Sequence, residues 1–108
     1  GVLPGLITQN MPRLKQKLEE WGIDEVVICS SINKIGYLMS PSIQAYTDAI
    51  EKNDPQKYQL MAMCTLASGA IKATEAYNFI NSLNIQSVVF GASSEKNIKE
   101  TVSLIQKQ

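Results

Sequence analysis

Small hydroxyl residues and glycines gather at three places where an apolar, strand-like run ends. These places are residues 30–34 (SSINK), 65–69 (TLASG) and 91–94 (GASS). In parallel α/β folds the chemistry collects at the carboxyl ends of the strands, so the three segments together form the candidate site. Hydroxyls, an amide and one lysine suit hydrogen bonding to a phosphorylated or polar ligand. Proton transfer is disfavoured, because the chain has no histidine and a serine nucleophile would lack its base.

The last of the three turns has the strongest pattern for anion binding. Residues 87–90 (SVVF) are typical of a buried strand, and Gly91 permits the sharp turn that follows. Ser93 is the expected N-cap of the next helix, with Ser94 as the second candidate. The apolar stripe of that helix, which is expected to lie on the sheet, consists of Ile98, Val102 and Ile105. Free N–H groups at the helix start can hold an anion, but the turn has no Lys or Arg, so it permits a phosphate without requiring one.

Three further side chains have chemistry of their own. Lys34 lies just after a strand-like run, where it can contact a phosphate or form a Schiff base, although a solvated loop lysine is the commoner case. Cys29 and Cys64 end apolar runs and are expected to be buried, reduced thiols in a cytoplasmic protein. Two isolated thiols without histidine lack the spacing that zinc requires, so we expect no metal site.

Length and charge place the chain among small globular domains. Its 108 residues make one domain or part of one, and ten basic residues balance ten acidic ones at a formal net charge of zero. No basic cluster occurs, which argues against a nucleic-acid surface, and no apolar run is long enough to cross a bilayer. The first residue is not methionine, so we expect the chain to begin at a processing scar, a tag remnant or the cut end of a longer protein.

The elements that must position these residues alternate along the chain, after an irregular start over residues 1–8. Helices are predicted over residues 10–22, 41–53, 73–83 and 93–105, and strands over residues 25–29, 58–64 and 87–90. The first helix is expected to bury Leu14, Leu18 and Trp21 and to expose Lys15. The inward faces of the next two helices are predicted to be Ile43, Tyr46 and Ile50, and then Ala76, Tyr77, Ile80 and Leu83.

This order, αβαβαβα, predicts a parallel sheet covered by helices and joined by right-handed crossovers. Only about three strands are found in this way, and three strands cannot close a barrel of eight. The expected organisation is therefore a single partial domain over residues 1–108.

Two segments resemble the aldo-keto reductases, a family of TIM-barrel oxidoreductases. MAMCTLASGAIKATEAYNFI resembles the seventh βα unit of that family, and VVFGASSEKNIKETVSLI is similar to the eighth. VVICSSINKIGYLMSP looks like the sixth unit. The resemblance implies the C-terminal part of a TIM barrel that contacts NADP, with no catalytic residue in this chain. The implied cofactor contacts are Leu66, Ala67 and Ser68 near the pyrophosphate, and Gly91, Ser93, Asn97 and Glu100 around the adenosine phosphate.

Three functions remain open from the sequence. The first is the cofactor-binding C-terminal portion of an aldo-keto-reductase-like, NAD(P)-dependent oxidoreductase, whose parent acts on a small carbonyl substrate and whose catalytic half lies outside this chain. The second is a non-catalytic half-barrel that associates with itself or with a partner to cover its open edges. The third is a phosphate-binding lyase or aldolase that uses Lys34. In the first two cases exposed apolar surface predicts association, either with a second copy or with a missing N-terminal half.

Overall fold

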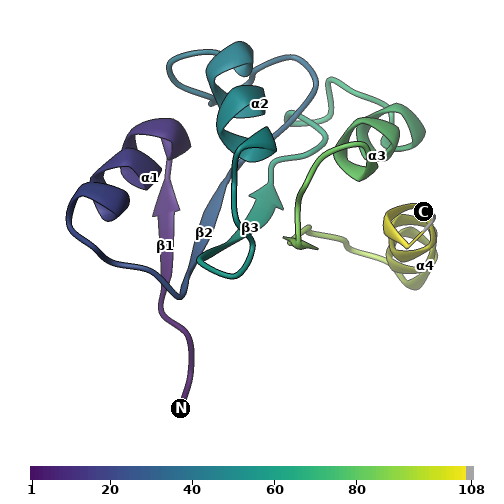
Figure 1. The fold of residues 1–108 in the computed structure, drawn as a ribbon. Coiled ribbons are helices and arrows are strands. Elements are labelled where there is room, and N and C mark those ends of the chain that lie inside the picture. Colours follow the sequence, from purple (N-terminus) through teal and green to yellow (C-terminus); the bar gives the residue numbers. More distant parts are fainter. Residues whose placement is uncertain (107–108) are drawn as a thin grey trace.

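The computed structural model describes residues 1–106 as an alternation of strands and helices (Figure 1). The elements are, in chain order, β1 (Gly5–Thr8), α1 (Met11–Glu20), β2 (Val26–Ser31), α2 (Ile43–Glu51), β3 (Tyr58–Met63), α3 (Ala73–Asn81), β4 (Ser87–Val88) and α4 (Glu95–Ile105). All the strands are parallel, and their order in the sheet, β1-β2-β3-β4, is the order of the chain. The predicted α/β class and parallel alternation are confirmed.

The helices lie along one side of the sheet. Every crossover leads to the next strand in the same direction, so right-handed connections put each helix on the same face. Figure 1 shows this as an arc that runs from α1 beside β1, through α2 and α3, to α4 at the far end. Within β2, Val26, Ile28 and Ser30 are buried under the helices, whereas Val27 and Cys29, which alternate with them, are only half-buried.

We call the side of the sheet away from the helices the open face. Its strand residues, placed by alternation and register, are Gly5, Ile7, Val27, Cys29, Ser31, Gln59, Met61, Met63 and Ser87, of which Ser31 is fully buried. Among the described strand residues, none on this face is charged. Parallel sheets are normally covered on both sides, so this uncharged open face is an unusual surface for a parallel sheet.

Strand β1 corrects the predicted element order, which becomes βαβαβαβα. Residues 1–8 were expected to be irregular because of Pro4 and Gly5, yet Gly5 to Thr8 pair in register with Val27 to Ser30. The strand lies at the sheet edge, and Ile7 is 75% exposed. An edge strand held mainly by backbone pairing has no alternating buried face, which is the pattern that sequence reasoning detects.

Helix α1 packs on the sheet through a face that matches the predicted one in part: Leu18 is buried and Leu14 is partly buried as expected, but Trp21 and Lys15 differ. Its buried residues are Met11, Lys15 and Leu18, whereas Trp21 is 64% exposed at the C-cap. The aliphatic stem of Lys15 takes a core position, with its ammonium group 5.9 Å from the centre of the Tyr58 ring. Counting lysine as polar therefore assigned it to the wrong side of the helix.

Helices α2 and α3 pack as predicted, and each is tied to the end of the preceding strand by a tyrosine. The buried residues of the two helices include Tyr46 and Ile50 of α2, and Ala76, Tyr77 and Ile80 of α3. The Tyr46 hydroxyl lies 2.9 Å from Ser30 Oγ at the end of β2, and the Tyr77 hydroxyl lies 2.8 Å from Thr65 Oγ1 just after β3. The same kind of hydrogen bond, from a helix tyrosine to a hydroxyl at the end of the preceding strand, therefore recurs in two consecutive βα units.

The last unit is less buried than predicted. Strand β4 is only two residues long, Val89 is 47% exposed, and α4 has no buried residue among those the structure describes. The expected inward stripe of α4 is at best half-buried, and Ile98 is 46% exposed. With an outer edge that pairs with no further described strand, β4 has only one neighbour to support it.

Helix starts and cysteines also differ in detail from expectation. Helix α2 is capped by Ser42, which accepts a hydrogen bond from the Ala45 N–H, so it begins after Pro41 rather than at it. Cys29 is half-buried, but Cys64 is exposed in the turn after β3, where its φ is 52°. Within the described part of the chain, no helix is long and apolar enough to cross a membrane.

Candidate functional site

A hollow of about 590 Å³ lies where the last two βα units meet, at the carboxyl edge of the sheet. We call it the carboxyl-edge hollow. The loop after β3 and the start of α3 contribute Leu66 and Ala73 to it. The rest of the lining comes from the turn after β4 and from α4: Gly91, Ala92, Ser93, Asn97, Glu100 and Thr101. The hollow thus combines a small apolar wall with neutral hydrogen-bonding side chains and one carboxylate.

The cap of α4 leaves Ser93 free for this hollow. Ser94, not Ser93, is the N-cap, and its Oγ accepts a hydrogen bond of 3.1 Å from the Asn97 N–H. Within the described residues, the side chains of Ser93, Asn97 and Glu100 form no hydrogen bond or ion pair. Their hydrogen-bonding groups are therefore available to a ligand, next to the N–H groups of the first helical turn.

The structure brings together five of the seven predicted contact residues. Leu66, Gly91, Ser93, Asn97 and Glu100 all line the carboxyl-edge hollow. The other three residues of the lining, Ala73, Ala92 and Thr101, were not among the predicted contacts.

The other two predicted contacts, Ala67 and Ser68, lie outside the hollow. The Ala67 side chain is 3% exposed and packs with Ile71 and Ala76, so burial keeps it from a ligand. Ser68 borders a neighbouring depression with Tyr37 and Cys64. Only Leu66 of the predicted pyrophosphate contacts therefore reaches the hollow.

The loop after β3 stores backbone strain beside the hollow. Cys64, Ala67 and Ser68 have φ values of 52°, 50° and 59°, and Gly69 follows at 89°. Left-handed conformations cost non-glycine residues about 1–2 kcal/mol each, and such residues concentrate at functional sites. No sequence pattern predicts this strain, because only Gly69 is a residue that favours positive φ.

Asn33 and Lys34 prove to be structural parts of the β2–α2 loop. The Asn33 side chain is fully buried; it donates to the carbonyl groups of Tyr37 and Cys64 and accepts from the Tyr37 N–H. Lys34 Nζ forms an ion pair of 2.6 Å with Glu75 Oε1 of α3. A nucleophilic lysine is activated by burial or by a second cation, whereas Lys34 is about half exposed and faces a carboxylate.

The ion pair with Lys34 changes the pKa of Glu75. The hydrogen bond and the positive charge of Lys34 lower the pKa of Glu75. The bond between the β2–α2 loop and α3 is therefore present at neutral pH and is lost as the pH falls through the lowered pKa of Glu75.

Burial raises the pKa of Cys29, and the neighbouring Cys64 raises it further. The Cys29 thiol therefore stays protonated at neutral pH and is a poor nucleophile or metal ligand. The described residues contain no group of three or more His, Cys, Asp or Glu side chains that could hold a metal ion.

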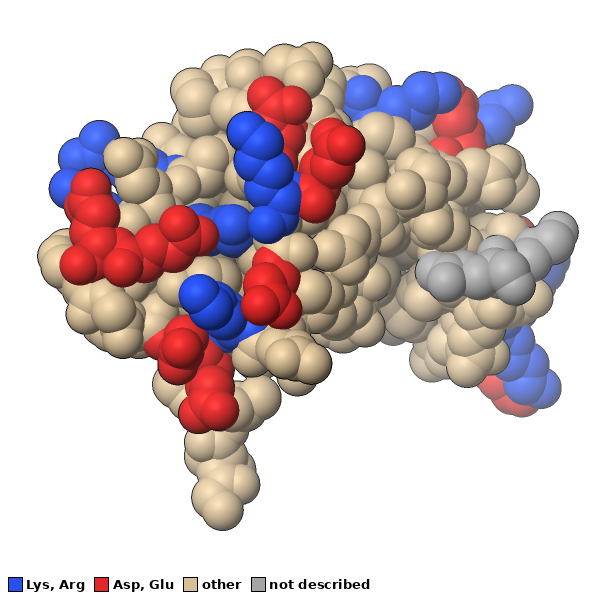
Figure 2. All heavy atoms as spheres, viewed as in Figure 1, with Lys and Arg blue, Asp and Glu red and all other residues tan. Residues whose placement is uncertain are grey.

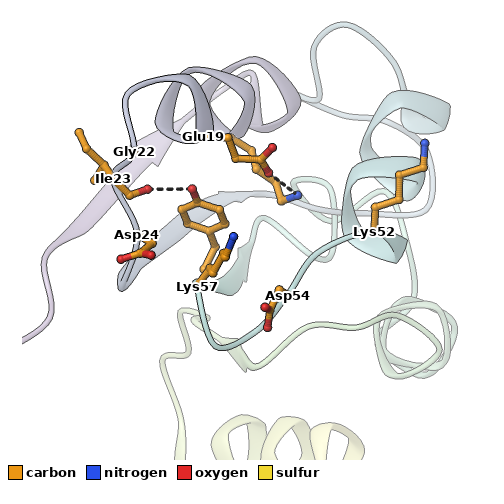
Figure 3. A pocket seen from close by; sticks show the side chains of 9 residues that line it. Glu19, Gly22, Ile23, Asp24, Lys52, Asp54 and Lys57 are labelled. Atoms are coloured by element: carbon orange, nitrogen blue, oxygen red, sulfur yellow. Dashed lines mark hydrogen bonds and ion pairs between the residues drawn. The ribbon is translucent and has the colours of Figure 1, made fainter.

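A second hollow, of about 300 Å³, lies at the opposite, amino ends of β2 and β3 (Figure 3). We call it the amino-edge hollow. The Tyr58 hydroxyl donates a hydrogen bond of 2.7 Å to the Ile23 carbonyl, and Lys15 Nζ lies 3.2 Å from Glu19 Oε1. Burial raises the pKa of Tyr58, and the charges of Glu19 and Asp24 add to the shift. Its hydroxyl therefore remains a hydrogen-bond donor.

The amino-edge hollow is balanced in charge. Its lining includes three lysines and three carboxylates: Lys15, Lys52, Lys57, Glu19, Asp24 and Asp54. Figure 2 shows basic and acidic side chains interspersed on this part of the surface, with no broad patch of one sign. Tyr58 and Lys15 link three parts of the chain: helix α1, the loop before β2, and strand β3. These links indicate a structural role.

The fold and the carboxyl-edge hollow define a parallel βα protein with a polar hollow on the side of the sheet where such folds bind ligands. Comparisons of the chain with protein-family models, with curated proteins and with solved structures gave no match. What the chain does must therefore be argued from its own geometry.

Proposed function

We propose that this chain is the cofactor-binding C-terminal part of an aldo-keto-reductase-like oxidoreductase of the cytoplasm. In this proposal the carboxyl-edge hollow holds the adenosine end of a nicotinamide dinucleotide, NADP or NAD. The catalytic groups and the site for a small carbonyl substrate lie outside these 108 residues, in the remainder of a TIM barrel.

The observation that supports this proposal best is the composition of the carboxyl-edge hollow. Five residues that the family resemblance associates with the cofactor, from two different βα units, line one concave surface. Leu66 and Ala73 offer apolar contact to the nucleotide, and Ser93 and Asn97 offer free hydrogen-bonding groups beside a helix N-terminus.

Binding of NADH is expected to perturb the backbone amides of Leu66 and of residues 91–101. The hollow is shallow and exposed, so we expect millimolar affinity, which NMR titration of the ¹⁵N-labelled chain detects. In a Ser93→Asp variant the new carboxylate repels the dinucleotide phosphates, and the perturbations should disappear.

Ser103→Asp is the matched control, because it adds the same charge to an exposed serine of the same helix that does not line the carboxyl-edge hollow. It should leave binding unchanged. Absence of perturbation with the unmodified chain, or perturbation centred on another part of the surface, would contradict the proposed cofactor site.

The open face supports the idea that further structure covers this sheet. Ile7 is 75% exposed, and Val27 and Met61 are half-buried without any element above them among the described residues. In the proposed parent enzyme the other half of the barrel covers this face. The second candidate function, a non-catalytic half-barrel that pairs with itself, is favoured by the same observation.

Without that cover the chain is expected to self-associate at high micromolar concentration. An Ile7→Lys variant should remain monomeric, because a charge on the open face opposes burial while the exposed position costs the single chain little. Sedimentation velocity over a range of concentrations measures the change.

The control for this experiment is Gln44→Lys, which places the same charge on the helix side at an exposed residue and preserves an i,i+4 partner for Asp48. It should associate as the unmodified chain does. A chain that stays monomeric throughout the concentration range would show that the open face needs no cover.

A further inference from the structure

A further hollow, of about 510 Å³, is formed by the loops of three successive βα units. We call it the aromatic hollow. Its lining consists of Tyr37 and Leu38 of the β2–α2 loop, Met63, Cys64 and Ser68 at and after the end of β3, and Val89, Phe90 and Gly91 after β4. It therefore lies at the carboxyl ends of the strands, where parallel α/β folds bind ligands. Only Gly91 also lines the carboxyl-edge hollow.

The aromatic hollow has an apolar wall with a few neutral polar groups. Within the described part of the chain, no Lys, Arg, Asp or Glu residue belongs to its lining. Two of the lining side chains are aromatic, and the polar groups are the Tyr37 and Ser68 hydroxyls and the Cys64 thiol. Small-molecule sites of about 300–1,000 Å³ typically have this composition. The absence of charge indicates an uncharged ligand.

Tyr37 and Cys64 bring unused hydrogen-bond donors to the aromatic hollow. Neither the Tyr37 hydroxyl nor the Cys64 thiol forms a hydrogen bond with another described residue. Both side chains are exposed, Tyr37 by 40%. A phenol is the stronger donor of the two, and a carbonyl oxygen of a ligand would accept its proton.

The backbone behind these two side chains is held by one buried residue. The Asn33 amide donates to the carbonyl groups of Tyr37 at 2.8 Å and of Cys64 at 3.3 Å, and its Oδ1 accepts from the Tyr37 N–H at 2.8 Å. Walls that come from two different loops are therefore fixed relative to each other, while the polar ends of their side chains stay free. A site that is fixed before binding loses little conformational freedom when a ligand enters.

We propose that the aromatic hollow binds a small, uncharged aromatic molecule that carries a carbonyl group. The ring of the ligand contacts Leu38 and Phe90, and its carbonyl oxygen accepts a hydrogen bond from the Tyr37 hydroxyl. An anionic ligand is excluded because no cation of the lining offsets the loss of its hydration. This site goes beyond the proposed function, since it does not depend on nucleotide binding in the carboxyl-edge hollow.

Benzamide is a suitable probe, because it is aromatic and uncharged and has a carbonyl oxygen. Titrated into the ¹⁵N-labelled chain, it should give saturable perturbations at the backbone amides of residues 37–38, 63–64, 68 and 89–91. A Kd of about 1 mM is expected for a ligand of this size. Benzoate has the same ring and a negative charge, so it should bind at least about ten-fold more weakly.

Leu38→Asn tests the apolar wall and should weaken benzamide binding at least about five-fold. Leu38 has a φ of 56°, a conformation that asparagine adopts readily, so the variant is expected to fold. Ile35→Asn is the matched control, because Ile35 is a 56% exposed apolar residue of the same loop that does not line the aromatic hollow. It should leave the Kd for benzamide unchanged.

Four results would overturn the inference. They are the absence of saturable perturbation, perturbation spread over the open face, equal binding of benzoate and benzamide, and equal effects of the two asparagine variants. Chemical shifts of residues 37–38 and 89–91 that change with protein concentration but not with benzamide would also overturn it, since a second copy of the chain would then fill the hollow.

Discussion

Replacing Asn33 with alanine is expected to lower the free energy of unfolding by about 2–3 kcal/mol, since it removes two hydrogen bonds within the β2–α2 loop and one that holds this loop to the residue after β3. The Asn33 amide donates to the Tyr37 carbonyl at 2.8 Å and to the Cys64 carbonyl at 3.3 Å, and its Oδ1 accepts from the Tyr37 N–H at 2.8 Å. The side chain is fully buried, so its truncation also leaves a small cavity. Chemical denaturation followed by circular dichroism measures the loss.

Two further variants separate hydrogen bonding from packing at this position. Asn33→Asp has nearly the same shape but places an acceptor against the Tyr37 and Cys64 carbonyl oxygens, so it should destabilise the protein at least as much at neutral pH. Asn78→Ala removes the same amide from an exposed position on α3 and should change stability little. An Asn33→Asp variant as stable as the unmodified protein would contradict the hydrogen-bond argument.

Replacing Tyr46 with phenylalanine is expected to lower the free energy of unfolding by about 2 kcal/mol. The Ser30 hydroxyl proton is used toward the Thr8 carbonyl at 2.9 Å, so the Tyr46 hydroxyl must donate to Ser30 Oγ. The same Tyr46 oxygen accepts a hydrogen bond of 3.1 Å from the buried Met11 N–H. One hydroxyl therefore joins the ends of β1 and β2 to the start of α1, and its removal leaves a buried N–H without a partner.

Two other tyrosines provide internal comparisons for the Tyr46→Phe experiment. Tyr77→Phe removes a single hydrogen bond, the one to Thr65, and should cost about 1 kcal/mol. Tyr37→Phe removes a hydroxyl that has no protein partner among the described residues, and should leave thermal stability unchanged. An equal loss in all three variants would show that the hydroxyl groups act through something other than these contacts.

The sequence patterns predicted most accurately the helices that bury their apolar residues against the strands of their own βα unit. Tyr46, Ile50, Tyr77 and Ile80 recur at helical spacing and are buried as expected, because α2 and α3 each lie over strands on both sides. Strand β1 escaped detection because pairing of an edge strand depends on backbone groups, which every sequence has. Lys15 was assigned to the exposed face of its helix. Its long aliphatic stem is buried instead, while its ammonium group pairs with the carboxylate of Glu19.

The sequence predicted the location of the candidate site better than the individual residues that line it. The loops after β3 and β4 bring Leu66 and Ser93 into one hollow with Glu100 of α4, at the edge where parallel sheets usually bind ligands. Two neighbouring serines were candidates for the N-cap of α4. Ser94 rather than Ser93 forms the cap. Ala67 is buried in a loop that has consecutive left-handed residues, a conformation that no local sequence pattern predicts.

The sequential strand order has a consequence for how the protein folds and opens. Each parallel pairing closes a loop of only about 20 to 30 residues, so contact order is low for a protein built on a parallel sheet. Units joined only to their neighbours can open one at a time. The unit formed by β4 and α4, with two paired residues and no buried side chain in its helix, is then the least cooperative part of the isolated chain. The proposed nucleotide would bridge this unit to the loop before α3, so binding would couple local unfolding of the last unit to cofactor occupancy.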